Sequence, residues 1–269
     1  MSNLPSHASV VVIGGGIMGC STLYHLGKLG VSDAILLERN KLTSGTTWHS
    51  AAQVRALRNS QNLTRMIQYS VELYSQLEKE TGQNVGWIQK GSLSIATTAD
   101  RLIHIKRQEA LANAYGLDAT SISSGEALER WPMMNGDDVL GAVWSPDDGR
   151  VSPSDVCAAL IKGARKTDNQ IFENCGVSAV LTKNGKVVGV ETTAGTVMCD
   201  AIAICSGLWS REIGAMAGAE VPVLACEHFY LLTKPIDGIQ GNTPTLSDHD
   251  SHLYIRDDSG GLLVGCFEP

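Results

Sequence analysis

The sequence lacks an apolar run of the ~20 residues that a transmembrane helix needs, so it predicts no membrane span. Met1–Ser9 contains no lysine or arginine and no apolar core segment, so we expect no secretory signal. Basic residues are in the minority, with 21 against 28 acidic ones and a net charge of −7, and they form no basic stripe. We therefore expect no membrane or nucleic-acid partner and a cytoplasmic protein, or a protein of the mitochondrial matrix in a eukaryote.

The seven cysteines form no C-x-x-C pair, and the seven histidines form no H-x-x-x-H pair. Dispersed cysteines in apolar runs, such as Cys205, predict buried free thiols in a reducing compartment rather than disulfides. His249 and His252 are close in sequence, but they lie among aspartates in a predicted loop. We therefore predict no metal site.

The N-terminal segment contains a glycine pattern typical of dinucleotide-binding folds. The β-branched run Val10–Ile13 predicts a buried strand, and Gly14, Gly16 and Gly19 match G-x-G-x-x-G ahead of a predicted helix over residues 20–29. Gly14 permits a tight turn, Gly16 lets the backbone approach a pyrophosphate, and Gly19 lets the helix pack closely on the strand. The N–H groups at the start of the helix would bind the phosphates.

An acidic residue follows this pattern at the spacing of a nucleotide site. A second apolar run, residues 34–37, ends in Glu38, which we expect to accept hydrogen bonds from the adenosine ribose. An acid at this position disfavours the 2′-phosphate of NADP. The alternative is a glycine-rich turn without a ligand, but strand, helix, second strand and acid together favour the dinucleotide site.

The remaining chain alternates helix and strand patterns, and its length allows about two domains. Asn184–Gly185 predicts a tight hairpin turn. We expect helices over 62–81, 99–115, 123–131, 152–166 and 209–217, and strands over 91–96, 177–181, 187–192, 195–199, 200–205, 227–233, 251–256 and 262–266. This order predicts an α/β fold, α+β overall, in which a Rossmann-like βαβ nucleotide domain is interleaved with an antiparallel β-rich domain.

The segment Leu42–His49, directly behind the second strand, resembles the flavin-attachment sequence of the sarcosine and dimethylglycine dehydrogenases. These belong to the D-amino-acid-oxidase superfamily of FAD enzymes. The resemblance covers essentially the whole chain, and several segments are more similar to sarcosine dehydrogenases than to dimethylglycine dehydrogenases. It extends over 86–91, 147–149 with Pro153, 189–192, 205–209, 227–230, 247–250 and 254–256.

The resemblance implies a bound FAD that is attached covalently to His49 through the flavin 8α carbon; the alternative is a loop histidine that caps a carbonyl. It implies an FAD domain over 1–88 and 148–222, and a substrate domain over 89–147 and 223–269. The expected cofactor-binding residues are Gly14, Gly16, Ile17, Gly19, Glu38, Arg39, Thr46, Thr47, Trp48, His49, Val177, Ser206, Gly207 and Trp209.

The resemblance also implies a substrate site with His228, Tyr254 and Arg58 as the residues that act on the substrate. Either Arg55 or Arg58 could pair with a substrate carboxylate, and sarcosine dehydrogenases resemble this chain better at Arg58. Each residue has a structural alternative: an edge histidine, a core tyrosine, or a solvated arginine at a helix start.

The implied activity is oxidative demethylation of an N-methyl amine such as sarcosine or dimethylglycine, by hydride transfer to the flavin. Either an electron-transfer flavoprotein or oxygen would accept the electrons. A hydroxy-acid or glycerol-phosphate dehydrogenase is an alternative, as is a truncated FAD-domain fragment without activity. Family members continue past the position of Pro269 into the rest of the FAD domain and a folate-binding domain, neither of which this sequence contains.

Overall fold

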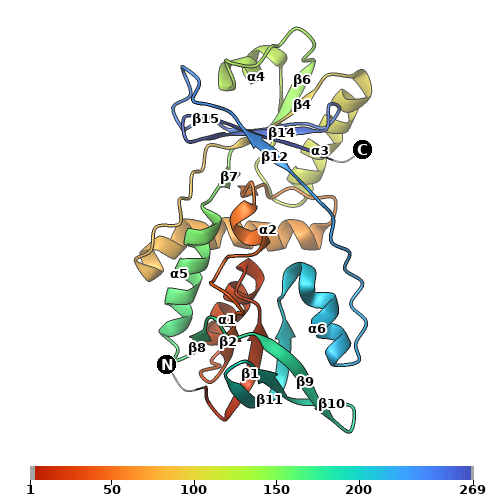
Figure 1. Cartoon of the computed structure of the whole chain (residues 1–269). Coiled ribbons are helices and arrows are strands. Elements are labelled where there is room, and N and C mark those ends of the chain that lie inside the picture. Colours follow the sequence, from red (N-terminus) through yellow and green to blue (C-terminus); the bar gives the residue numbers. More distant parts are fainter. Residues whose placement is uncertain (1–3, 268–269) are drawn as a thin grey trace. The chain divides into compact units, whose positions relative to one another are not determined.

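The computed structural model describes residues 4–267 and forms two units (Figure 1). Unit 1 comprises the residues up to Ser50, Leu77–Val85 and Ser152–Cys226. Unit 2 comprises Ala51–Gln76, Gly86–Val151 and the residues from Glu227 onward. Residues 51–76 therefore belong to unit 2, whereas the expected boundaries place them in the FAD domain. The assignment of a function to each unit stays a prediction.

A six-stranded sheet organises unit 1 in the order β8-β2-β1-β11-β10-β9. The central strand β1 runs parallel to β2 and to β11, and β2 runs parallel to β8, while β9, β10 and β11 pair antiparallel. The strands are β1 (His7–Ile13), β2 (Ile35–Leu37), β8 (Gln170–Phe172), β9 (Val177–Lys183), β10 (Lys186–Thr192) and β11 (Gly195–Ile204). Inward-facing aliphatic side chains such as Val11, Ile35 and Val197 form its core.

Two helices of unit 1 begin within one residue of the predicted start, whereas the first begins three residues earlier than predicted, at Ile17. Helix α1 (Ile17–Lys28) follows the glycine turn and packs against α5 (Pro153–Arg165), which has its proline in the first turn. Unit 1 also contains α6 (Ser210–Met216) and the short 3-10 helices η1 (Thr46–His49) and η2 (Gly207–Trp209). The predicted turn at Asn184–Gly185 is confirmed, since both residues have positive φ, 52° and 73°.

A seven-stranded sheet organises unit 2 in the order β12-β15-β14-β13-β4-β6-β5. All neighbouring strands run antiparallel except β13 and β4, which are parallel. The strands are β4 (Ser92–Ala96), β5 (Thr120–Ile122), β6 (Gly141–Ser145), β12 (Tyr230–Leu232), β13 (Thr245–Asp248), β14 (Leu253–Asp258) and β15 (Gly261–Cys266). Helices α3 (Ala99–Ala114) and α4 (Ser124–Arg130) pack on it, and α2 (Gln61–Thr81) continues from unit 2 into unit 1.

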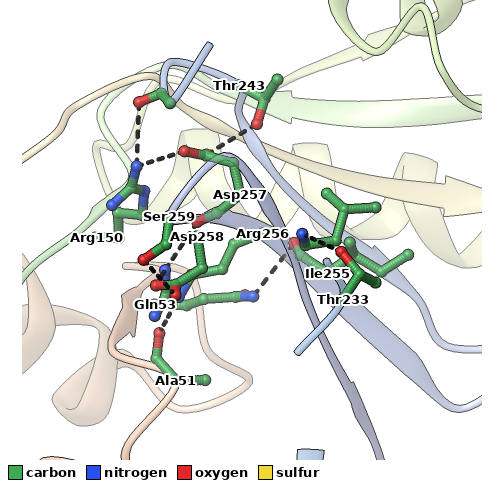
Figure 2. Close-up of polar contacts among 12 residues, drawn as sticks. Ala51, Gln53, Arg150, Thr233, Thr243, Ile255, Arg256, Asp257, Asp258 and Ser259 are labelled. Carbon is green, nitrogen blue, oxygen red and sulfur yellow. Dashed lines mark hydrogen bonds and ion pairs between the residues drawn. The ribbon is translucent and has the colours of Figure 1, made fainter. Parts of the chain in front are cut away.

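A polar cluster holds the start of unit 2 against the β14–β15 hairpin (Figure 2). Arg256 donates through Nε to the carbonyl oxygen of Ala51 at 2.7 Å and through Nη1 to Asp258 at 2.8 Å. Arg150 lies on β7 (Gly149–Arg150), which pairs with β3 (Gln53–Val54), and its guanidinium contacts the Asp257 carboxylate at 2.5 Å. The chain directly after η1 is thus fixed by buried charges as well as by strand pairing.

Several sequence predictions were wrong in detail. The two strands expected over 195–199 and 200–205 form one strand, β11, because the Asp200 side chain is exposed and does not interrupt it. The strand expected over 227–233 is shortened to β12, and residues 221–229 form neither helix nor strand. Two cysteines expected to be buried, Cys226 and Cys266, are exposed.

None of the helices in residues 4–267 combines the length and apolarity that membrane crossing requires. Within the same residues, no three histidine, cysteine or acidic side chains come together in a group that could hold a metal ion. The expectation for Met1–Ser9 falls partly on residues 1–3, which lie outside the described residues.

Candidate cofactor and substrate sites

The turn between β1 and α1 is so tightly packed that it requires glycine. Gly14 has φ of 113°, and a Cβ there would lie 2.5 Å from the carbonyl oxygen of Cys205. A Cβ on Gly19 would lie 1.8 Å from the carbonyl oxygen of Gly14, and one on Gly16 would lie 2.8 Å from Oγ1 of Thr47. The protein's own atoms thus fill the positions where side chains would stand, so only glycine allows the close path of strand, turn and helix that a pyrophosphate-binding turn of this type has.

The predicted flavin loop contacts this turn directly. Thr47, on η1, accepts a hydrogen bond through Oγ1 from the N–H of Ile17, the first residue of α1, at 3.0 Å. The N-cap, Gly16, has no side chain to do this. The structure therefore brings together three predicted cofactor residues, Gly16, Ile17 and Thr47, at the positive end of the α1 dipole.

Glu38 follows β2 and lies beside the same turn. Its Oε2 accepts from the N–H of Gly15 at 2.7 Å, and its Oε1 accepts from the N–H of Asn40 at 2.8 Å. Each carboxylate oxygen can accept a second hydrogen bond, so both still offer an acceptor to ribose hydroxyls. The residues of this turn therefore fit the adenosine-diphosphate half of a dinucleotide.

The other predicted cofactor residues of unit 1 divide into two groups. The Arg39 guanidinium stacks 4.0 Å from the centre of the Trp209 ring, and Trp209 follows Ser206 and Gly207 in η2. The Val177 side chain is partly buried and packs against the hydrophobic core of the unit. A cofactor contact by Val177 stays a prediction.

His49 ends η1 and is exposed. Its ring lies 3.7 Å from the Trp48 ring, centre to centre, at an interplanar angle of 35°. Trp48 is itself 53% exposed, and Thr46 is also exposed. The imidazole is therefore accessible to a cofactor, while its attachment to one stays a prediction.

In unit 2, one row of paired residues crosses four strands. Ser94 on β4 pairs with Ser247 on β13, Ser247 pairs with Tyr254 on β14, and Tyr254 pairs with Gly265 on β15. Directly paired residues point to the same face of a sheet. A Cβ on Gly265 would lie 2.0 Å from Cζ of Tyr254, so the tyrosine ring lies across this glycine. The row thus places two hydroxyls and a phenol side by side.

His228 and Arg55 extend the row at its two ends. Nε2 of His228 lies 3.2 Å from the Tyr254 hydroxyl, although His228 precedes β12 and is not on a strand as expected. At the other end, the Arg55 guanidinium donates to Oγ of Ser247 and, at 2.9 Å, to Oγ of Ser94. A cation, a phenol and an imidazole are thereby connected along one face.

The two candidate arginines lie in different environments. Burial lowers the pKa of the Arg55 guanidinium, and the carboxylate of Asp148 opposes this shift. Arg58 is exposed, and its guanidinium donates to the carbonyl oxygen of Leu57 at 2.7 Å. Arg58 is therefore the more accessible of the two, and Arg55 the more firmly held.

Three residues of this site, Asp148, Ser94 and Ser247, were not predicted from the sequence. The segment 147–149 carried part of the family resemblance, but nothing local indicated that Asp148 is buried. Burial raises the pKa of its carboxyl, against the opposing effects of Arg55 and of the hydrogen bonds from Ser92 and Ala56. The serines could not be identified because strands far apart in sequence bring them together.

His249 lies in a turn, as the sequence predicts. Burial lowers its pKa to about 4, with further contributions from the charges of Arg55 and Arg101. The imidazole is therefore neutral at pH 7, and its ring stacks on Phe267 with the ring centres 5.5 Å apart.

Comparison with known proteins identifies the family. Residues 9–268 match the DAO family, described as FAD dependent oxidoreductase. The chain belongs to this family. In structure, L-proline dehydrogenase from P. horikoshii is similar, with a TM-score of 0.88 and 26% identity over 97% of this chain and 70% of that chain.

Of two curated relatives, one is named as an enzyme and the other as a regulatory subunit. The mitochondrial sarcosine dehydrogenase of Mus musculus is 42% identical over 98% of this chain and 29% of its own length. The mitochondrial pyruvate dehydrogenase phosphatase regulatory subunit of Mus musculus is 44% identical over 98% of this chain and 30% of its own length. The DAO chain thus spans less than a third of each relative, and FAD is the cofactor of the family to which it belongs.

We expect Glu38→Ala to weaken FAD binding by about 1.5–3 kcal/mol, or roughly tenfold to a hundredfold in Kd, because charge-assisted hydrogen bonds are lost. The measurement is an FAD titration of the apoprotein in a His49→Ala background, so that no tether masks the affinity. Glu191→Ala, an exposed acid on β10 of the same sheet, is the matched control and should leave Kd unchanged. An unchanged Kd in Glu38→Ala would contradict the role assigned to this carboxylate.

Proposed function

We propose that this chain forms the FAD-binding region and part of the substrate-binding region of an enzyme that oxidises a small, carboxylate-bearing N-methyl amine. The observation that carries the proposal is the row in unit 2, in which the Tyr254–His228 pair lies on the same face as the serine contacts of Arg55, and Arg55 belongs to the segment that also carries Arg58. A cation suits a carboxylate, and a phenol with an imidazole suits an amine that must lose its proton. When bound, FAD supplies the acceptor for a hydride.

Each of the chain's own residues has a specific part in this proposal. His228 accepts the proton of the amine, or holds the neutral amine by a hydrogen bond, and Tyr254 orients His228 through the contact between Nε2 and the hydroxyl. Arg58, exposed and close in sequence to the flavin loop, anchors the substrate carboxylate. Arg55 is the alternative anchor.

We propose sarcosine as the substrate ahead of dimethylglycine, supported by the name and 42% identity of the mouse sarcosine dehydrogenase. The sequence contains no Lys/Arg cluster suited to a phosphate, which ranks a glycerol phosphate lower. The electron acceptor would be an electron-transfer flavoprotein or oxygen. The mitochondrial name of the relative supports a mitochondrial location if the source is a eukaryote.

The experiment measures flavin reduction by sarcosine under anaerobic conditions in the full-length protein. Arg58→Ala should raise the substrate Kd by about tenfold or more with a smaller change in the reduction rate, because an anchor contributes mainly uniform binding. His228→Ala should instead slow reduction, and the wild-type rate should rise with pH as the amine loses its proton. Arg65→Ala, an exposed arginine on α2, is the control. If Arg55→Ala alone weakens binding, Arg55 is the anchor and the assignment of Arg58 is wrong.

A covalent bond at His49 is a separate part of the proposal. The accessible imidazole follows Thr46–Thr47–Trp48, the pattern of the flavin-linked family. Acid-precipitated wild-type protein should therefore keep its yellow colour in the pellet, and His49→Ala should release the flavin to the supernatant while the fold persists. Release of all flavin from the wild-type protein would contradict the covalent attachment.

A second candidate function is that of a regulatory protein of this fold, which binds FAD but catalyses no reaction. The 44% identity to a relative named as a phosphatase regulatory subunit favours it. In that case the protein would bind FAD without its being reduced by an amine.

A further inference from the structure

Asp148 is a buried carboxyl with three connections inside unit 2. The residue is 3% exposed and immediately precedes β7. Its carbonyl oxygen accepts from the N–H of Gly91 at 2.9 Å, and its Oδ2 accepts from Oγ of Ser92, on β4, at 2.6 Å. These two bonds fix the residue to the sheet.

The other carboxylate oxygen contacts the segment that carries both candidate anchors. Oδ1 accepts a hydrogen bond from the backbone N–H of Ala56 at 2.8 Å. Ala56 is itself buried, and it lies between Arg55 and Arg58 in the chain. The Oδ1 atom thus holds the backbone of this segment at a buried position.

The contacts around this bond hold the segment at both sides. The Arg55 side chain is bound by Ser94 and Ser247 of the sheet. On the other side, Thr64, which is fully buried, accepts from the N–H of Arg58 at 3.0 Å and donates to its carbonyl oxygen at 3.1 Å. In the middle, Asp148 binds the backbone through its carboxylate.

We infer that Asp148 is a positioning residue: by binding the N–H of Ala56, its carboxylate fixes the Arg55–Arg58 segment to the sheet and so sets where the substrate carboxylate is held. It acts through the backbone of this segment rather than by touching the substrate. The consequence for the substrate rests on the proposed function, but the contact itself does not.

Three variants separate geometry from charge and from general stability. Asp148→Asn keeps an oxygen that accepts from Ala56 but removes the charge. Asp148→Ala removes both, and Ser92→Ala removes the other bond of the same carboxylate while leaving Ala56 bound. Hydrogen exchange at the amide of Ala56 and the KM and kcat for sarcosine are measured in the full-length protein.

We expect Asp148→Ala to speed exchange at Ala56 by about tenfold or more and to raise KM by about tenfold with kcat within about twofold. Asp148→Asn and Ser92→Ala should stay within about threefold of the wild type in both readouts, even where they lower the melting temperature. If Asp148→Ala does not fold, wild-type-like exchange in Asp148→Asn is the deciding result.

If Ser92→Ala speeds exchange at Ala56 and raises KM as much as Asp148→Ala does, the inference is overturned, since a general structural role would affect both variants alike. Changes in exchange and KM in Asp148→Asn as large as those expected for Asp148→Ala would also overturn it, because the charge of Asp148 rather than its hydrogen bond to Ala56 would be responsible. If the protein oxidises no amine, the exchange measurement still decides the positioning role, so the two failures can be distinguished.

Discussion

Replacing Gly19 with alanine should abolish FAD binding and lower the free energy of unfolding by about 2–3 kcal/mol or more. The added Cβ would lie 1.8 Å from the carbonyl oxygen of Gly14, a backbone atom that cannot move without opening the turn. The start of α1 would shift away from β1, and the backbone cradle for the pyrophosphate would be lost. Chemical denaturation and an FAD titration measure the two effects.

A glycine in open surroundings gives the control for this substitution. Gly125 lies on α4, where an added Cβ would meet only Oγ of Ser123 at 4.0 Å. Gly125→Ala should therefore be neutral, or stabilising by up to about 1 kcal/mol, because alanine favours a helix. Normal FAD binding by Gly19→Ala would show that the turn does not hold the cofactor.

Removing the Asp257 carboxylate should have the largest effect on stability in unit 2. Its side chain is 1% exposed and contacts Arg150, which is 15% exposed, at 2.5 Å (Figure 2). Asp257→Ala leaves this arginine buried without its partner, which costs about 3–5 kcal/mol in comparable buried pairs. Oδ1 of Asp257 also accepts from Thr243 at 2.8 Å, and that bond is lost as well. Urea denaturation checks the value.

Lys41 provides the matched comparison at the surface. It contacts Glu173 at 3.4 Å, but its side chain is 68% exposed. Lys41→Ala should change the free energy of unfolding by less than about 1 kcal/mol, since water screens such a pair. A cost for Asp257→Ala no greater than that for Lys41→Ala would show that the cluster in Figure 2 does not stabilise unit 2.

The part of the site that could be predicted from sequence is the part built from neighbouring residues. The turn at Gly14–Gly19 and the position of Glu38 after β2 follow from glycine geometry and the β-branched pattern, which act over short distances. The same holds for the start of α5 at Pro153. The fold class, with a parallel βαβ unit and an antiparallel sheet, also follows from local patterns.

The remainder depends on pairing between distant segments. Strand β13 was missed because Thr245, Ser247 and Asp248 are polar, yet all three are buried between β4 and β14. The row of Ser94, Ser247 and Tyr254 exists only because β4 and β13 pair in parallel. His228 was expected on a strand over 227–233, but Phe229 beside it is exposed and β12 begins only at Tyr230.

The most direct test of the proposed function is an anaerobic titration of the flavin-loaded, full-length protein with sarcosine, followed by the visible absorbance of the flavin. We predict that sarcosine bleaches this absorbance, faster at higher pH, and that glycerol 3-phosphate and hydroxy acids do not. Bleaching by a hydroxy acid or glycerol 3-phosphate, and by no N-methyl amine, would contradict it. If no donor reduces the bound FAD, the amine-oxidising function is also contradicted, and the non-catalytic regulatory function is favoured.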